Sequence, residues 1–377
     1  MSGQKKTAAI IGAGMGGLAT AANLRRIGIE VTIYEQARAF ARVGAGIQQG
    51  PNSVKVLRGM GLEERVRSVA FHPEMTRYRD AATGDLLWQR TQGAEYEEKY
   101  GAPQLLLHRA DLHEALASIV PADVIQRSKK LIDFRQDGDG VNMFFADGSS
   151  ARADMMIAAD GVHSMVRERM HGPEQPRFTG RVAYRTTFPT ALIKNVEVEG
   201  STKWMAKDRH IVIYFTNPRK DEVYFVTSTP EPSFNIESWS AEGDLDQLLR
   251  EYSEFHPIVR GVLEACPAVH KWALVERDPL PFWTQGRITL LGDSCHPMTP
   301  YMAQGAGTSI EDAAILARCL ADASTSDIPR ALKIYEANRK PRTSWIQASS
   351  STNDIERFRR EQDQVFSYNA WETPLAA

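Results

Sequence analysis

The chain has 377 residues and a formal net charge of −2 at pH 7, so it offers no general attraction for nucleic acid or an anionic membrane. Its three cysteines, Cys266, Cys295 and Cys319, are odd in number and lack C-x-x-C spacing, and no third ligand accompanies Cys295 and His296 at usable spacing. This pattern argues against a disulfide framework and a metal site. No early stretch resembles a signal peptide, and no apolar run could span a bilayer. These features predict a cytoplasmic protein with one large domain or two connected ones.

The stretch from Ala8 to Glu35 predicts a dinucleotide-binding unit. Its first four residues form an apolar run, which is typical of a strand buried on both faces of a parallel sheet. Apolar residues then recur at helical spacing, and a second strand ends at the acid Glu35. In this context the helix N-terminus faces a pyrophosphate and the acid accepts a hydrogen bond from a ribose hydroxyl. The turn between strand and helix carries the glycines Gly12, Gly14, Gly16 and Gly17.

The next segment is dense in glycine from Arg42 to Asn52. This density favours a backbone that lies against a flat ligand, with a flexible loop as the alternative. Residues 53–60 predict a short helix that ends at Gly61. Residues 71–104 mix strand-like aromatic pieces with turn residues, so we expect them to lie outside the first sheet.

Three further strands end in turns that border the ligand crevice, if the strands belong to a parallel sheet. Arg109 could contact a ligand or form an exposed salt bridge at a helix start. Asp160 could likewise contact a ligand or lie in a solvated turn. The strands and turns are residues 105–107 before Arg109, residues 155–159 before Asp160 and Gly161, and residues 287–291 before Gly292 and Asp293.

A second glycine cluster, residues 305–307, precedes a predicted helix over residues 308–316. We expect Thr308 or Ser309 to cap this helix, with acidic residues in its first turn. From Arg339 onward charged and amide side chains dominate the sequence, which predicts a solvated helical tail.

Residues 177–271 change to aromatic-rich alternating segments, which predict a second, mostly antiparallel sheet. Period-two alternation puts His210, Val212 and Tyr214 on one face of a strand, with three apolar residues on the other. A face that carries histidine and tyrosine points either to solvent or into a pocket.

The ordered set of motifs resembles the flavin-dependent aromatic hydroxylases of the para-hydroxybenzoate hydroxylase class. The resemblance covers nearly the whole chain and is strongest to 6-hydroxynicotinate 3-monooxygenases, then to salicylate hydroxylases. It implies an α/β fold with a Rossmann-like FAD-binding domain of the GR2 type, an inserted, mostly antiparallel sheet domain for substrate, and a C-terminal helical segment. The motifs are Gly12-x-Gly14-x-x-Gly17 with Glu35, His108-Arg109-Ala110-Asp111-Leu112, Asp160-Gly161, Gly292-Asp293-Ser294-Cys295-His296-Pro297 and Ala303-Gln304-Gly305-Ala306-Gly307.

The same resemblance implies where the domains lie and which residues hold FAD. A helix N-terminus after Gly305 would face the flavin and stabilise the negative charge of its reduced form. The expected domains are residues 1–70, 105–176 and 272–345 for FAD, residues 71–104 and 177–271 for substrate, and residues 346–377 for the helical tail. Besides the glycine turn, the expected FAD contacts are Glu35, Gln36, Arg109, Leu131, Asp160, Gly161, Asp293, Gly305 and Ala306.

The resemblance further implies that NADH or NADPH reduces FAD, that O2 forms a flavin hydroperoxide, and that one oxygen atom passes to a hydroxylated pyridine or benzene carboxylate, with or without decarboxylation. A base would activate the ring by taking the proton of its hydroxyl. We expect Tyr214, assisted by His210, to act in this way. We also expect Gln48 at the catalytic site. It stands where the 6-hydroxynicotinate enzymes carry a histidine, and an amide cannot exchange a proton. Tyr301 and Ser201 likewise replace a histidine and a cysteine of those enzymes.

Two other functions remain open at this point. One is an FAD-dependent oxidase or dehydrogenase of the same fold without oxygen insertion, because a fold alone does not set the chemistry. The other is a non-catalytic flavoprotein. As partners we expect a small aromatic acid, NADH or NADPH and O2, and as assembly a monomer or a homodimer.

Overall fold

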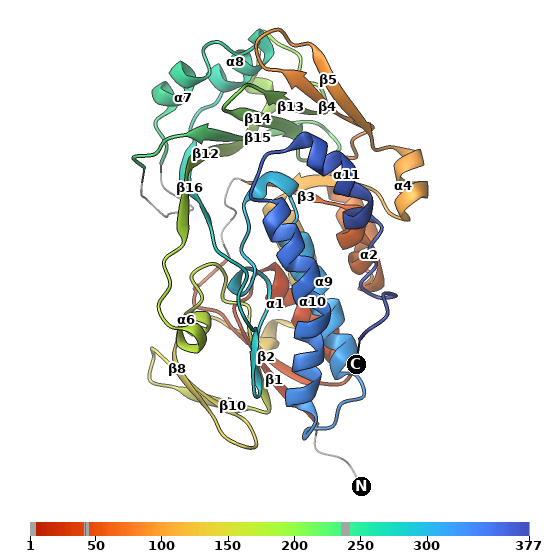
Figure 1. Cartoon of the computed structure of the whole chain (residues 1–377), viewed down its shortest axis with the longest axis vertical. Coiled ribbons are helices and arrows are strands. Elements are labelled where there is room, and N and C mark those ends of the chain that lie inside the picture. The colour runs from red at the N-terminus through yellow and green to blue at the C-terminus, as the bar shows by residue number, and fades with distance from the viewer. Residues whose placement is uncertain (1–4, 41, 43–44, 235–241, 377) are drawn as a thin grey trace.

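The computed structural model describes residues 5–40, 42, 45–234 and 242–376. Two large sheets organise these residues, one in the upper and one in the lower half of Figure 1. Among them no helix has the length and apolar character that a membrane crossing requires.

The lower sheet has six strands in the order β17-β18-β11-β1-β2-β7. Neighbouring strands pair in parallel, except that the edge strand β17 runs antiparallel to β18. Central residues such as Ile10, Ile157 and Leu290 have 0% exposure, which confirms the prediction of strands buried on both faces. The strands are β1 (Thr7–Ile11), β2 (Glu30–Tyr34), β7 (Ile125–Gln126), β11 (Met155–Ala158), β17 (Thr284–Gln285) and β18 (Ile288–Leu290).

Three long helices in the lower half of the molecule pack against one another. Helix α1 (Met15–Arg26) links β1 to β2 and packs against α9 (Gly305–Leu320), which in turn packs against α10 (Ile328–Ser349) (Figure 1). The shorter helices here are α2 (Pro51–Gly59), α3 (Glu63–Val69), α5 (Arg109–Ala117) and α6 (Met165–His171). A separate antiparallel sheet contains β8 (Leu131–Gln136), β9 (Val141–Phe145) and β10 (Ser150–Ala153). Single turns of 3-10 helix are η1 (Ala122–Val124), η2 (Thr190–Leu192), η3 (Gly292–Ser294) and η4 (Pro300–Met302).

One strand expected to end in the crevice of a parallel sheet lies elsewhere. Strand β6 (Leu105–His108) pairs antiparallel with β3 (Gly46–Gln49) in a two-stranded sheet. The apolar run of β6 did predict a buried strand, but an apolar run does not identify the partner strand. Pairing with β3 brings the glycine-dense segment beside the start of α5, where the Arg109 N–H donates to Ala45 O at 2.8 Å. Of that segment, Val43 and Gly44 lie outside the described residues.

The upper sheet has seven strands in the order β16-β12-β15-β14-β13-β4-β5. Only the β13–β4 pair is parallel, so the prediction of a mostly antiparallel second sheet is confirmed. Strand β16 continues to Glu276, five residues beyond the boundary expected after residue 271. The strands are β4 (Met75–Asp80), β5 (Leu86–Thr91), β12 (Arg177–Pro189), β13 (Ser201–Met205), β14 (His210–Phe215), β15 (Glu222–Pro230) and β16 (His270–Glu276).

The two faces of β14 have different surroundings. Ile211 and Ile213 are fully buried in a cluster with side chains of α7 (Leu245–Glu251) and α8 (Pro257–Glu264), which cover the outer face of the sheet in Figure 1. Because side chains alternate along a strand, His210, Val212 and Tyr214 lie on the inner face. The inner face lies toward α11 (Ile355–Phe366), which runs beneath the sheet near α4 (Ala94–Tyr100).

The prediction of a solvated tail from Arg339 onward is wrong. The Arg339 side chain has 0% exposure, and its guanidinium donates to the buried carboxylates of Glu311 and Asp312. Val365 and Phe366 at the end of α11 are also buried, in a cluster with Met302 and two tyrosines. The prediction failed because the charged residues of a buried ion network are of the same types as those of a solvated helix, so composition alone does not distinguish the two.

Candidate active site

A cavity of about 500 Å³ lies between the two sheets and extends from the glycine turn of α1 to the inner face of β14. Six of the described residues that were predicted to bind the cofactor do not line this cavity, namely Gly12, Gly17, Glu35, Gln36, Leu131 and Asp160. The predicted site residues that line it are Gly14, Gly16, Gln48, Arg109, Gly161, His210, Tyr214, Asp293, Gly305 and Ala306.

The glycines of the turn have separate physical roles. A Cβ on Gly17 would lie 2.1 Å from Gly12 O, and a Cβ on Gly12 would lie 2.4 Å from Ala159 O. These two glycines therefore allow α1, β1 and the end of β11 to approach closely. At Gly14 a Cβ would meet nothing within 4 Å, so the cavity reaches the backbone here. That space is where a pyrophosphate could approach the helix N-terminus.

Two helices begin at the cavity wall without a side-chain cap. Helix α1 begins after Gly14 and α9 begins after Gln304, and neither position has a side-chain cap hydrogen bond. The start of α9 corrects the predicted cap: the helix begins at Gly305, no acid occupies its first turn, and Thr308 Oγ1 donates to Gln304 O instead. Uncapped N–H groups and the positive end of a helix dipole suit an anionic or electron-rich ligand.

The predicted ribose ligand Glu35 fastens the turn. Its carboxylate accepts hydrogen bonds from Ala13 N at 2.8 Å and Ala37 N at 2.7 Å. Each carboxylate oxygen keeps a lone pair for a further donor such as a ribose hydroxyl. Gln36 is exposed beside it, and Leu131 is 7% exposed at the start of β8.

Charged groups also line the cavity. Arg109 lines it, whereas Asp111 forms the helix-start ion pair, with Arg42. Burial lowers the pKa of Arg109, and the charge of Asp293 acts against this shift. Burial raises the pKa of Asp293, opposed by nearby positive groups. The Asp160 side chain is half-buried, its Oδ2 accepts a hydrogen bond from Val166 N at 3.3 Å, and burial raises its pKa.

The polar face of β14 opens into the cavity and not to solvent. His210 is 5% exposed and Tyr214 is 2% exposed, yet both line the cavity. They are four residues apart on one strand, which corresponds to about 13 Å, and Val212 lies between them. The expected assistance of Tyr214 by His210 therefore cannot be a direct hydrogen bond. The His210 ring lies 5.7 Å from that of Tyr301, and the Tyr214 ring lies 5.0 Å from that of Tyr224.

A lysine and an asparagine fix the state of His210. The Lys203 ammonium donates to Asn353 Oδ1, and Asn353 Nδ2 lies 3.0 Å from His210 Nδ1. Because an ammonium can only donate, the amide must present its oxygen to Lys203 and its NH2 group to His210. His210 Nδ1 is then an acceptor and Nε2 carries the proton. Burial, with Lys203 and Arg181 nearby, lowers the pKa of His210 well below 6.5, so the ring is neutral at pH 7.

Burial raises the pKa of Tyr214 well above 10. The phenol therefore stays protonated and acts as a hydrogen-bond donor at neutral pH. In this state neither Tyr214 nor His210 is a free base. Both can instead donate to an oxygen atom of a bound ring.

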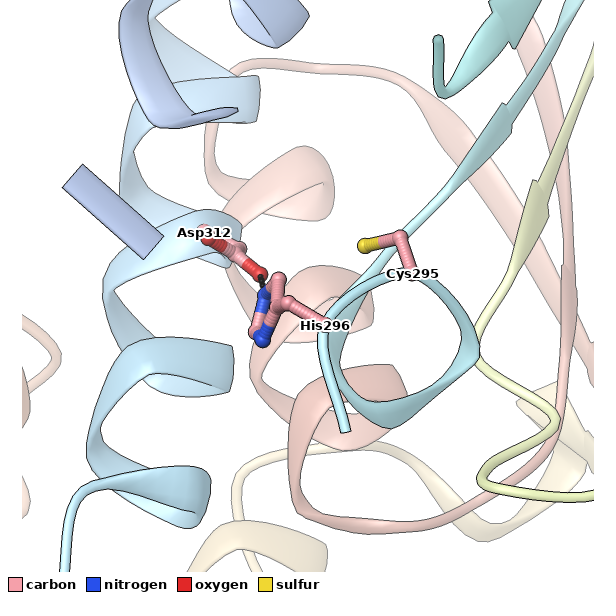
Figure 2. Close-up of side chains that lie close together, drawn as sticks. All are labelled: Cys295, His296 and Asp312. Carbon is pink, nitrogen blue, oxygen red and sulfur yellow. Dashed lines mark hydrogen bonds and ion pairs between the residues drawn. The ribbon is translucent and has the colours of Figure 1, made fainter. Parts of the chain in front are cut away.

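Figure 2 shows Cys295, His296 and Asp312 side by side, with potential metal-ligand atoms within 4.8 Å of one another. The spacing argument missed Asp312 because it comes from α9. However, His296 Nε2 and Asp312 Oδ2 are 2.6 Å apart, and Arg339 Nε donates to the other carboxylate oxygen at 2.6 Å. Burial raises the pKa of Cys295 well above its usual value, which keeps it a neutral thiol. The adjacent guanidinium and the neutral thiol make the cluster a poor cation site.

The same cluster orders the predicted cofactor turn. Asp312 Oδ2 also accepts from Gly292 N at 3.1 Å, directly before Asp293. Burial alone would raise the pKa of Asp312, but His296 and Arg339 hold it below the usual value. The ionised carboxylate thus ties the turn after β18 to α9 and, through Arg339, to α10.

The sequence analysis missed several residues of the site. Lys203 lies on the cavity face of β13, and alternation along that strand could have indicated it. Asn353 and the α11 residues Phe358 and Phe366 enter the cavity from the supposed tail, and no local pattern signals this position.

The donor set of the cavity fits FAD. Two uncapped helix starts face it, the backbone is open at Gly14, and a Cβ at Gly305 would meet no atom closer than 4.0 Å. A dinucleotide needs close backbone approach at its pyrophosphate, and a reduced flavin needs a positive helix end.

Comparisons with known proteins identify the family of the chain. The family described as FAD binding domain matches residues 5–349. The 6-hydroxynicotinate 3-monooxygenase of Bordetella bronchiseptica is 42% identical over 373 residues, which cover 98% of this chain and 97% of that protein. A solved salicylate hydroxylase substrate complex has a TM-score of 0.83 at 26% identity and covers 98% of this chain and 97% of that chain. HpxO of Klebsiella pneumoniae, complexed with FAD and uric acid, has a TM-score of 0.82 at 26% identity and covers 97% of this chain and 93% of that chain. The chain therefore belongs to the FAD binding domain family, among its FAD-dependent aromatic monooxygenases.

Proposed function

We propose that the protein is a single-component monooxygenase that hydroxylates a hydroxylated pyridine or benzene carboxylate, using NADH or NADPH and O2. The observation that carries this proposal is the continuity of the cavity from the start of α9 to the polar face of β14. The relatives named for 6-hydroxynicotinate and salicylate support the substrate class. From the sequence we also propose the division into an FAD-binding and a substrate-binding domain given above.

When bound, FAD supplies the redox chemistry, since it takes electrons from the nicotinamide and activates O2 for transfer to the ring. The side chains of the cavity prepare the ring. We assign Tyr214 and His210 to opposite ends of the substrate, because both line the cavity and about 13 Å of strand separates them. A donor to the ring oxygen stabilises the negative charge that this oxygen carries once the hydroxyl has lost its proton, and the deprotonated ring is the better nucleophile.

Gln48 belongs to this site as a binding residue. It lies on β3, lines the cavity and presents an amide. An amide can orient a substrate by donating and accepting hydrogen bonds, but it cannot carry a proton. Proton transfer in this protein therefore differs from that in an enzyme with histidine at this position.

Helix α11 and the loop before it shield the site from water. Asn353, Phe358 and Phe366 line the cavity from this segment. Exclusion of water from such a site prevents side reactions of reactive intermediates.

The test is a screen of hydroxylated benzoates and pyridine carboxylates for stimulation of NADH or NADPH oxidation by the FAD-loaded protein. The expected result is a hydroxylated product formed in proportion to the NADH or NADPH consumed, with CO2 released where the carboxylate lies on the attacked carbon. Stimulated oxidation that yields only hydrogen peroxide, with every compound, would instead support an oxidase. If no compound stimulates NADH or NADPH oxidation, the protein is a flavoprotein without monooxygenase activity on these compounds.

A further inference from the structure

Lys203 projects into the middle of the substrate end of the cavity. It lies on β13, where Ser201 pairs with Tyr214, Lys203 pairs with Val212 and Met205 pairs with His210. The Lys203 side chain is therefore on the same face of the sheet as His210 and Tyr214, one strand away from the residue between them. It lines the cavity together with all three of these β14 residues.

No acidic side chain neutralises this lysine within the described part of the chain. Among the described residues its ammonium donates to the neutral amide of Asn353 and forms no ion pair. Enclosure lowers the pKa of Lys203 to about 7, as expected for a cation without a counter-ion.

The acids that line the cavity have other partners. Asp354 accepts from Arg357 N at 3.0 Å as the cap of α11, and Glu361 accepts from Arg357 Nε at 2.8 Å. Asp293 lies near Arg109 at the other end of the cavity. Lys203 thus has no acidic partner among the described residues, and its ammonium form is placed to receive negative charge from outside the chain.

We propose that Lys203 is the counter-ion of the substrate carboxylate and selects aromatic acids over their neutral analogues. This inference rests on the proposed function and adds the residue that recognises the acid group. A carboxylate is the fitting partner because it is charged throughout the neutral range, whereas a ring hydroxyl with a pKa near 10 is mostly neutral there. Asn353 positions the lysine by holding one of its three N–H groups, which leaves the other donors for the carboxylate oxygens.

The experiment measures dissociation constants by titration calorimetry on the FAD-loaded protein. The probes are two matched pairs, 6-hydroxynicotinate with 6-hydroxynicotinamide and salicylate with salicylamide, which differ only in carboxylate against carboxamide. The wild-type protein should bind a carboxylate about ten- to a hundredfold more tightly than its carboxamide, the range expected for charge-assisted hydrogen bonds. Lys203→Met should abolish this preference, and Lys203→Arg should retain part of it.

Two further variants sharpen the test. Lys207→Met removes a lysine four residues along the chain that is exposed and does not line the cavity, so it should behave as the wild type. Asn353→Asp gives Lys203 an internal counter-ion and should also reduce the preference for carboxylates. This variant keeps the lysine, so it tests the inference even if Lys203→Met fails to fold. Flavin content and thermal melting confirm that each variant is folded.

The inference is overturned if the wild type binds carboxamides as tightly as carboxylates, or if Lys203→Met keeps the full preference. It is also overturned if Lys203→Met weakens 6-hydroxynicotinate but leaves nicotinate, which lacks the ring hydroxyl, unchanged. In these cases stimulated hydroxylation can persist, so the proposed function survives. Conversely, absence of any hydroxylated product rejects the proposed function whatever the binding preference.

Discussion

At the scale of single residues, His210 and Tyr214 face the cavity from one strand, and each can donate a hydrogen bond to a bound ring. Alternation put both side chains on one face of residues 210–215, and the structure confirms this arrangement. Alternation could not decide between solvent and a pocket, because that depends on what covers the face. The family resemblance led us to expect that His210 assists Tyr214, whereas about 13 Å of strand separates the two residues.

Tyr214→Phe tests whether the tyrosine is a donor or a base. Loss of the hydroxyl should lower kcat/KM for the hydroxylated product by about ten- to a hundredfold, since one hydrogen bond to a charged oxygen is lost. Because burial raises the pKa of Tyr214 well above 10, the pH profile below pH 10 should keep its shape. Steady-state kinetics from pH 6 to 9.5 measure both quantities. A basic limb that disappears in the variant would show that the tyrosine loses its proton during the reaction.

At the scale of elements, the connection between β1 and α1 depends on close backbone approach. The spacing of the glycines predicted this turn correctly, because each glycine stands where a side chain would block a close approach to the backbone. The structure adds that the two glycines have different roles. Gly17 allows the backbone of Gly12 to approach closely, whereas Gly14 leaves space for a ligand.

A pair of alanine substitutions separates these two roles. Gly17→Ala places a methyl group against the Gly12 carbonyl and should lower the free energy of unfolding of the FAD-free protein by at least about 1–3 kcal/mol. Gly14→Ala meets no protein atom within 4 Å, so it should leave this free energy nearly unchanged while weakening FAD binding. Urea unfolding and flavin titration provide the two measurements. Equal destabilisation by both substitutions would contradict the assignment of roles.

Helix α11 illustrates an element whose existence was predictable and whose position was not. The Phe366 ring packs on Tyr96 and Tyr100 and also lines the cavity. Charged residues on the rest of the helix gave the sequence the character of a free tail. The buried end of the helix instead depends on aromatic residues more than 260 positions away.

Phe366→Ala should loosen this cover. With water admitted to the cavity, a larger share of the NADH or NADPH consumed should appear as hydrogen peroxide and a smaller share as hydroxylated product. Product and peroxide assays on the same reaction measure the two shares. Arg360→Ala, at an exposed position of the same helix, is the matched control and should leave them unchanged. An unchanged peroxide share in Phe366→Ala would show that α11 does not exclude water.

At the scale of the whole molecule, a buried charge network joins segments distant in sequence. Arg339 of α10 contacts Glu311 and Asp312 of α9, and Asp312 holds the turn before Asp293. Loss of one partner from such a network leaves an uncompensated buried charge, which typically costs about 3–5 kcal/mol. The network therefore couples the stability of the fold to the order of the cofactor turn.

The pH dependence of this coupling follows from the carboxylates. The pKa of Asp312 is lowered in the folded protein, so its contribution to stability is complete above the unfolded value of about 4 and is lost as the pH falls through the folded value. The free energy of unfolding of the wild type should exceed that of Asp312→Asn most at pH 7, and the difference should shrink below about pH 4. Urea unfolding of both proteins between pH 7 and pH 3 measures it. A difference independent of pH would mean that Asp312 contributes no charge to the fold.

The sequence by itself determined the glycine turn, the buried strands around it and the alternating face of β14, because turn sterics and side-chain periodicity act over a few neighbouring residues. It could not determine that β6 pairs with β3, or that the charged C-terminal segment folds back over the cavity. Nor could it bring Lys203 to Asn353, which are 150 positions apart. Only the tertiary structure decided these points, because whether a charge is solvated or buried depends on the segments packed around it, and those segments are remote in the chain.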